Sequence, residues 1–474
     1  MKALQLISLL VLLSVLTACK KEDPEPVYEA GSNEYVNDWI YGEMSTYYYW
    51  NKELPAKNIT GISPDDYFYQ LISSKDRFSW IQPNFIELLN SLQGVSKEAG
   101  YEFILYNNPN IENGVIGQIS YVKKNSPASE NDLKRGDLFT KINGTELTVS
   151  NYSTLLGGIS ENHTLTLQRY NEATETFENL GVQEFTTVNF AENPHYLDTV
   201  YTRNGKKIGY YVYNFFATGP NSSDTQYLQE MDAIFEKFKS EGIQHLVLDL
   251  RYNSGGAESA TINLASLVGT NISPEDIFVK RDYNEELKEA LIEEYGQEVL
   301  NKKFTQKAAN IGNILQSPQL TVLSSSRTAS ASELLINGLS PFMDILIIGD
   351  TTVGKNVGSI SIYEENKPEN TWGMQPIITK SFNSEDQSDY DMGFYPDIPK
   401  KDNSLIVKAL GDQQELLLSE ALNYLAGDDL PALKTSSPLL PAKDIYSSIE
   451  QKRRFGIYNI DAIDLLNQEK SPYD

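Results

Sequence analysis

The chain has 474 residues, which is too long for one compact core and is typical of two to four domains. With 39 Lys and Arg against 65 Asp and Glu, its net charge of -26 disfavours binding to the phosphate backbone of a nucleic acid. One cysteine excludes a disulfide within the molecule, and three widely spaced histidines argue against a zinc site. We therefore expect any catalysis to rest on Ser, Lys, Asp or Glu, without a cofactor or a metal.

The first residues have the features of a secretory signal. A basic start precedes an apolar stretch, and the motif LTAC then ends at Cys19. LTAC resembles the lipobox of bacterial lipoproteins, which implies a signal peptide over residues 1–18 and a lipid anchor on Cys19. The alternative is an ordinary secretory signal with an incidental cysteine. We expect a lipid-anchored protein of the cell envelope, on the outer membrane or the cell surface, with the periplasmic face also open.

Two segments precede the first β-type sequence. Residues 19–33 are polar and contain proline, which is typical of a flexible tether. Residues 34–95 carry many aromatic side chains in a mostly helical pattern, which predicts a small helical domain with aromatic packing. No catalytic constellation appears in this part.

Short β-type runs fill residues 96–190. A strand at residues 114–122 is followed by a short helix ending in LKRGD, a strand at residues 138–142 and an Asn-Gly hairpin turn. This order resembles a PDZ domain of the bacterial protease type, which implies a groove that takes a peptide as an added strand. The family's Gly-rich carboxylate-binding loop is not obvious, and residues 99–103 are the nearest candidate. A structural or regulatory role therefore stays open.

Apolar runs alternate with amphipathic helical patterns over residues 195–427, which predicts a layered α/β domain. Three of these runs, at residues 246–250, 320–325 and 345–349, each end in a loop that carries reactive side chains or glycines. Sites collect at the carboxyl ends of strands in such sheets, so we expect the three loops to converge. Residues 428–474 form a C-terminal tail without a motif that suggests a function.

Four motifs occur in order in this region: DLRYNSGG (249–256), TASASE (328–333), GDTTVGK (349–355) and GFYPDI (393–398). Together they resemble the carboxyl-terminal processing proteases, the tail-specific serine peptidases of family S41. The resemblance implies a multidomain α/β protein: a helical N-terminal segment, a PDZ-like β-rich domain and a layered α/β catalytic domain like those of Clp protease and crotonase. It also implies a serine endopeptidase for envelope or extracellular proteins and peptides, with cleavage near carboxyl termini as one option.

By this resemblance the nucleophile is Ser330, one of three clustered serines with Ser326 and Ser332, and the general base is Lys355. The pKa of a base lysine must fall from about 10.4 to about 7, which destabilises the charged form by roughly 4 kcal/mol and is within the reach of burial. The apolar run at residues 345–348 indicates such an interior. The non-catalytic alternatives are a helix cap for the serine and a solvated charge for the lysine.

The same resemblance places the oxyanion hole on the backbone N–H of Gly255 or Gly256 and on that of Ala331. Glu333 stands where some members have an acid that orients the lysine, although a surface carboxylate would fit the sequence as well. The alternative function is a catalytically inactive surface lipoprotein that keeps this fold and binds peptides or other ligands, or serves in assembly. Either function implies peptide or protein partners and a membrane reached through the lipid anchor.

Overall fold

The computed structural model describes residues 28–221, 223–427, 440–452 and 458–459. Cys19 and the expected signal peptide lie outside these residues, so the lipid anchor stays a prediction. Among the helices that the structure describes, none is long and apolar enough to cross a membrane.

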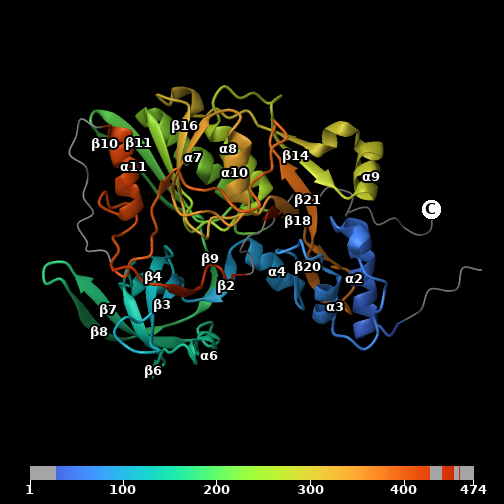
Figure 1. Cartoon of the computed structure of the whole chain (residues 1–474), viewed down its shortest axis with the longest axis horizontal. Coiled ribbons are helices and arrows are strands. Elements are labelled where there is room, and N and C mark those ends of the chain that lie inside the picture. The colour runs from blue at the N-terminus through green and yellow to red at the C-terminus, as the bar shows by residue number, and fades with distance from the viewer. Residues whose placement is uncertain (1–27, 222, 428–439, 453–457, 460–474) are drawn as a thin grey trace, which may run out of the picture.

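A sheet with parallel central strands forms the middle of the α/β domain (Figure 1). Its strand order is β10-β11-β12-β16-β17-β22. The strands are β10 (His195–Arg203), β11 (Lys206–Tyr213), β12 (His245–Asp249), β16 (Gln319–Ser324), β17 (Asp344–Gly349) and β22 (Ile398–Pro399). The pairs from β11 to β22 are parallel, and β10 pairs antiparallel with β11. The three apolar runs of the sequence are strands, as predicted, and they are neighbours at the centre of the sheet.

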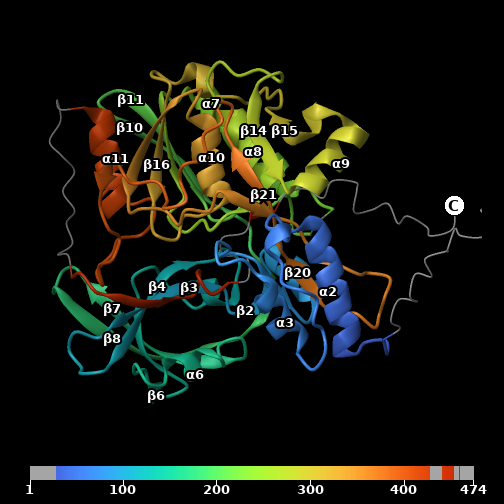
Figure 2. The same ribbon diagram turned by 45° about the vertical axis from the view of Figure 1, so that its right-hand side comes forward.

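Helices cover both faces of this sheet (Figure 2). Leu246 and Leu248 of β12 belong to the core that includes side chains of α7 (Gln226–Glu241), α8 (Glu258–Val268) and α10 (Ala331–Leu339). Val247, which lies between them, packs in a second core with α11 (Leu416–Ala426). Successive side chains of a strand point to opposite faces, so a sheet buried on both faces requires continuous apolar runs.

A second sheet of the α/β domain has the order β13-β24-β18-β21-β14-β15. Its strands are β13 (Gly256–Ala257), β24 (Tyr458–Asn459), β18 (Val357–Ser359), β21 (Ile377–Phe382), β14 (Ile277–Tyr283) and β15 (Asn301–Lys303). Strand β24 comes from the C-terminal tail and pairs in parallel with both β13 and β18. Helix α9 (Glu285–Tyr295) and the short helices η2 (Gln297–Leu300) and η3 (Gly312–Ile314) complete this region.

The N-terminal segment is mostly helical, as expected. It contains α2 (Asn33–Tyr47), η1 (Asn51–Glu53), α3 (Pro64–Leu71), β1 (Trp80–Gln82) and α4 (Phe85–Leu92). Strand β1 pairs with β20 (Gly373–Gln375), which also pairs with β19 (Ile362–Tyr363). Ile40 and Phe68 are fully buried in the same core as the central sheet. The aromatic segment therefore packs on the α/β domain and shares its core.

The β-rich domain has the strand order β23-β3-β4-β5-β7-β8, with β6 beside β5. These strands are β3 (Tyr101–Asn107), β4 (Val115–Val122), β5 (Leu138–Ile142), β6 (Thr145–Glu146), β7 (His163–Asn171), β8 (Thr176–Phe185) and β23 (Asp444–Ser447). Helices α5 (Pro127–Glu130) and α6 (Tyr152–Leu156) and the pair β2 (Val95–Glu98) and β9 (Val188–Ala191) complete it.

The predicted strands and hairpin of this domain are confirmed, but the short helix ends at Glu130, and the LKRGD motif forms a loop instead of the end of the helix. The turn between β5 and β6 has φ of 49° at Asn143 and 77° at Gly144, as a two-residue hairpin turn of this type requires. The tail was given no structural role by the sequence, yet it supplies β23 here and β24 in the second sheet.

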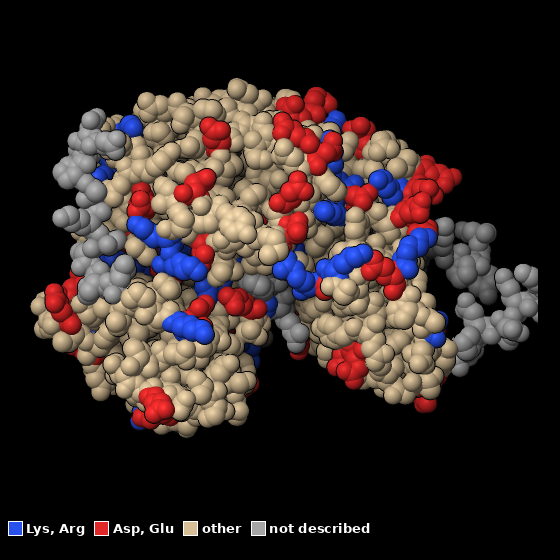
Figure 3. Space-filling model, in the orientation of Figure 1, with Lys and Arg blue, Asp and Glu red and all other residues tan. Residues whose placement is uncertain are grey.

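A buried ionic network joins the β-rich domain to the α/β domain. Arg135, in the loop before β5, donates to Asp402 Oδ2 at 2.8 Å. Arg251, which follows β12, donates to the same oxygen at 3.1 Å, to Asp249 Oδ2 at 2.8 Å and to Glu415 Oε2 at 2.9 Å. Figure 3 shows a hollow between the two lower lobes, and Lys and Arg side chains lie along the seam between these lobes and the α/β body.

We expect Arg251→Met to lower the free energy of unfolding by about 3–5 kcal/mol, because it leaves buried carboxylates without their shared partner. Urea unfolding followed by tryptophan fluorescence measures this loss. The control is Lys75→Ala, whose side chain is 63% exposed in its pair with Glu53, and which should cost at most about 1 kcal/mol. Equal losses for the two variants would contradict the importance of the network.

Candidate active site

Ser330 immediately precedes α10 and has an unusual backbone. Its φ is 59° and its ψ is -111°, a conformation uncommon outside glycine, and strain of this kind clusters at functional sites. The residue is buried, and its hydroxyl has no hydrogen-bond partner among the described residues. Of the other two serines, Ser326 is exposed and Ser332 Oγ donates to Asn253 O at 3.2 Å. Ser330 is therefore the serine of the three with a buried, uncommitted hydroxyl.

Lys355 lies in the loop that follows β17. Its side chain is buried, its amine has no hydrogen-bond partner within the described chain, and Nζ lies 5.0 Å from the centroid of the Phe78 ring. Burial lowers the pKa of Lys355 to about 7, although the carboxylates of Asp76 and Glu333 act in the opposite direction. A large fraction of this amine is therefore neutral near pH 7 and able to accept a proton.

The Glu333 carboxylate holds the serine and lysine loops together through their backbones. Its Oε2 accepts from Ser330 N at 2.7 Å and from Lys355 N at 2.9 Å. Its Oε1 accepts from Thr352 Oγ1 at 2.6 Å and from Gly354 N at 2.6 Å. Burial raises the pKa of Glu333, and these four hydrogen bonds oppose the rise. Glu333 is fully buried, so the alternative of a surface carboxylate is wrong.

The three loops converge at the carboxyl ends of their strands, as predicted. Asn253 O, after β12, accepts from Ala329 N at 3.2 Å in the serine loop. Thr328 O, in the serine loop, accepts from Val353 N at 3.0 Å in the lysine loop. The parallel neighbours β12, β16 and β17 bring these loops together although they are far apart in sequence.

The candidate oxyanion donors are three backbone N–H groups, and they differ in whether another acceptor already uses them. Gly255 N already donates to Asn253 Oδ1 at 2.9 Å. Gly256 has φ of 138°, and a Cβ there would lie 2.0 Å from Phe216 O, so only glycine fits this close approach. Ala331 is the first residue of α10, and an amide at that position has no intrahelical acceptor.

The N-terminal segment contributes to the site, contrary to the expectation from the sequence. The loop between α3 and β1 places Asp76 and Phe78 beside Lys355. Arg77 Nη2 donates to Gly354 O at 2.8 Å, and Tyr48 OH donates to Asp76 Oδ2 at 2.9 Å. The contacts with Gly354 and Lys355 join residues more than two hundred positions apart, and no local sequence pattern signals them.

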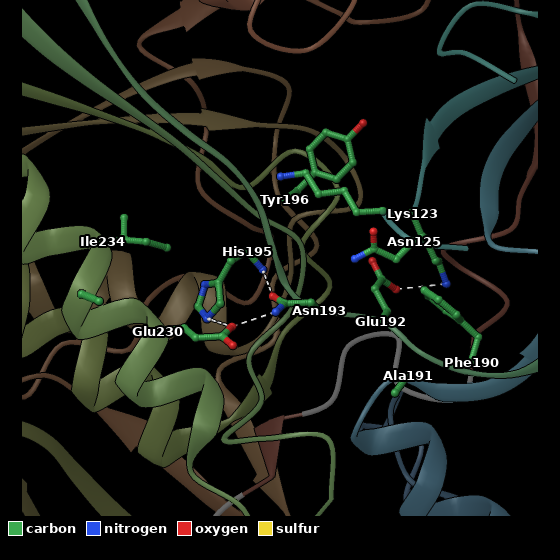
Figure 4. Close-up of a pocket in the computed structure, with 12 residues that line it drawn as sticks. Lys123, Asn125, Phe190, Ala191, Glu192, Asn193, His195, Tyr196, Glu230 and Ile234 are labelled. Atoms are coloured by element: carbon green, nitrogen blue, oxygen red, sulfur yellow. Dashed lines mark hydrogen bonds and ion pairs between the residues drawn. The ribbon is translucent and has the colours of Figure 1, made fainter. Parts of the chain in front are cut away.

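A cavity of about 480 Å³ lies between the β-rich domain and the α/β domain, and no candidate catalytic residue lines it (Figure 4). His195 at its wall is hydrogen-bonded to Tyr211 OH at 2.5 Å and to Tyr227 O at 2.8 Å. Burial lowers the pKa of His195, and these contacts give it a structural role. Within the described ranges, no cluster of three or more His, Cys, Asp or Glu residues could hold a metal ion.

Two family models match the chain. The model described as peptidase family S41 matches residues 207–399, and the model described as peptidase S41 N-terminal domain matches residues 35–80. A curated carboxyl-terminal-processing protease of Picosynechococcus sp. is 26% identical over 238 residues, which are 50% of this chain and 50% of the relative. The match thus spans about half the length of that relative.

Solved structures give matches over more of the chain. The crystal structure of a putative S41 protease from Bacteroides fragilis is 25% identical, with a TM-score of 0.69, and the match covers 85% of this chain and 98% of that one. The photosystem II D1 C-terminal processing protease is 18% identical, with a TM-score of 0.46, over 85% of this chain and 99% of that one.

We expect Glu333→Gln to destabilise the protein by about 1–3 kcal/mol, because either orientation of the amide turns its NH₂ group toward N–H or O–H donors. Thermal unfolding measures the loss. The control is Glu275→Gln, whose parent side chain is 86% exposed and whose unfolding temperature should stay unchanged. A Glu333→Gln protein as stable as the parent would contradict the assigned hydrogen bonds.

Proposed function

Because the chain belongs to peptidase family S41, we propose that it is a serine endopeptidase in which Ser330 is the nucleophile and Lys355 the general base. One observation carries the proposal. A hydroxyl and an amine, both buried and neither hydrogen-bonded to the other or to any other described residue, belong to two loops that one carboxylate joins. A solvated lysine would show neither property, whereas Ser330 is also the N-cap residue of α10.

The proposed mechanism moves one proton in a cycle. Neutral Lys355 accepts the proton of Ser330 Oγ while that oxygen bonds to the carbonyl carbon of the substrate. The resulting ammonium donates a proton to the departing amine as the peptide bond breaks. A water molecule then attacks the acyl-enzyme with the neutral amine as base, and Ser330 Oγ recovers its proton.

The developing oxyanion needs two donors. We assign them to the backbone N–H groups of Gly256 and Ala331, since Gly255 N already donates to Asn253 in its own loop. Gly256 permits the close backbone approach that this position requires, and Ala331 presents its amide at the positive end of α10.

The curated relative is by its name a carboxyl-terminal-processing protease. We extend this to the present chain as cleavage of envelope or extracellular proteins and peptides near their carboxyl termini, by an enzyme held to the membrane through a lipid on Cys19. The β-rich domain is proposed to be PDZ-like, because its strand, short helix, strand and hairpin follow the order that the sequence resemblance implies.

We expect Ser330→Ala and Lys355→Met each to lower kcat/KM for an unfolded protein substrate by about 10³-fold or more, because each removes one member of a unit. Mass spectrometry of the fragments measures the loss, and circular dichroism checks that the variants fold. The matched controls are Ser326→Ala and Lys401→Ala, whose parent side chains are exposed and which should keep full activity. A folded Ser330→Ala or Lys355→Met protein with near-parental activity would favour a non-enzymatic binding function for the fold.

We expect kcat/KM to rise with pH and to level off above about 7, the pKa of Lys355, because the ammonium form cannot accept the proton of Ser330. Asp76→Asn removes a carboxylate that favours the ammonium form, so its rising limb should move to lower pH. Asp386→Asn, at a position with a 74% exposed side chain, is the control and should leave the profile unchanged. If the rising limb of the kcat/KM profile stays in place or moves to higher pH in Asp76→Asn, the assignment of Lys355 as the general base is contradicted.

A further inference from the structure

The tail strand β23 lies along the edge of β3 in the β-rich domain. The pairing is antiparallel, with Asp444 opposite Tyr106 and Ser447 opposite Ile104. Ser448 N extends it by donating to Phe103 O at 3.0 Å. PDZ domains take up a peptide ligand in this way, as a strand added to the edge of a sheet. A segment of the chain itself therefore fills the position of a ligand.

Tyr446 anchors this strand between the sheet and a helix. Its ring stacks on Phe103 of β3 with centroids 5.9 Å apart, and meets Tyr152 of α6 edge-on at 6.1 Å. Ile445 and Tyr446 both pack against the core of the β-rich domain. Aromatic anchors of this kind supply much of the binding energy of peptide ligands. The groove between β3 and α6 is thus an apolar site with one aromatic subsite.

Carboxylates lie at the end of the groove next to residues 99–103, the nearest sequence candidate for carboxylate capture. Glu102 Oε2 accepts from Ser448 Oγ at 2.6 Å, and Glu98 and Glu102 lie 2.5 Å and 3.0 Å from Lys123 Nζ. Lys452 of the tail forms ion pairs with both of these acids. Burial alone would raise the pKa of Glu102, but Lys452 and Lys123 hold it below its usual value.

This arrangement of charges disfavours the binding of a peptide whose free carboxyl terminus lies at this end of the groove. If the tail leaves the groove, Lys452 leaves with it, and acidic side chains outnumber the remaining Lys123 at that end. A terminal carboxylate there would meet like charges, whereas an internal segment brings none. The loop at residues 99–103, which was the nearest sequence candidate for carboxylate capture, carries one of the acids.

The same tail segment contacts the loop that carries Ser330. Arg327, three residues before Ser330, donates to Ser447 Oγ at 2.9 Å and to Asp444 Oδ2 at 2.9 Å, and its Nε lies 3.1 Å from Glu450 Oε1. Further along, β24 pairs with Gly256 of the second sheet. Occupation of the groove is therefore physically connected to the serine loop.

We propose that the groove between β3 and α6 binds an extended internal peptide segment with an aromatic anchor, and that residues 443–452 occupy it as a built-in ligand that an external peptide must displace. The groove recognises the bound segment through hydrogen bonds to its backbone and through packing around its aromatic side chain. The proposal goes beyond peptidase activity and holds whether or not Ser330 cleaves peptides, so its test uses Ser330→Ala protein throughout.

The test measures binding of a fluorescent, amidated peptide of residues 442–452 by anisotropy. The covalently attached segment competes at high effective concentration, so the full chain should bind the peptide weakly. Adding Tyr446→Ala to the chain weakens that competitor and should tighten binding at least about tenfold. Tyr395→Ala, at a position 71% exposed, is the matched control and should leave binding unchanged.

A second variant covers the case in which Tyr446→Ala fails to fold. Asp444→Asn combined with Glu450→Gln removes the ion pairs with Arg327 and leaves the aromatic anchor in place. It should tighten binding of the peptide about threefold, since these partly exposed pairs contribute modestly. Absence of tighter binding in every folded variant would overturn the proposal, because the strand would then be a fixed part of the fold.

The choice between an internal segment and a free terminus is tested with peptides of residues 438–448 and the Tyr446→Ala chain. The amidated peptide should bind as well as the free acid or up to several-fold tighter, and added salt should narrow any difference. A free acid that binds tenfold tighter than the amide would overturn the proposal in favour of carboxylate capture.

Discussion

The buried carboxylate of Glu333 is the constraint on which the candidate site depends. Removing a carboxylate from water is costly, and it is tolerated when hydrogen bonds replace the lost hydration. Here four donors do so, and two of them are the backbone amides of Ser330 and Lys355. Because the restraint acts on the backbones, the hydroxyl and the amine stay without a hydrogen-bond partner in the described chain.

The lowered pKa of Lys355 depends on packing from a distant part of the chain. Lys355 is buried partly under Phe78, which belongs to the N-terminal segment, and that segment shares its core with the central sheet. Asp76 and Glu333 favour the charged form, yet desolvation outweighs them and brings the pKa to about 7. The helical segment that precedes the β-rich domain thus belongs structurally with the α/β domain.

The β-rich domain and the tail strand that pairs with it contact two of the loops at the candidate active site. Arg135 of the β-rich domain and Arg251 of the loop after β12 both donate to Asp402. Arg327 of the serine loop donates to Asp444 of the tail strand β23. Both sets of contacts use arginine, whose planar guanidinium can hold several acceptors from different segments at once. A ligand that changes the groove of the β-rich domain would therefore act on residues adjacent to Ser330.

The sequence by itself determined the central strands of the α/β sheet and the candidate reactive residues. Continuous apolar runs predicted β12, β16 and β17, and the TASASE and GDTTVGK motifs pointed to Ser330 and Lys355, because these signals are local. Only the tertiary structure decided that Glu333 is buried, that Asp76 and Phe78 adjoin the lysine, and that the tail completes two sheets. These contacts join segments far apart in the chain, and strands as short as β23 and β24 have too few residues for a periodic pattern, so nothing local in the sequence encodes them.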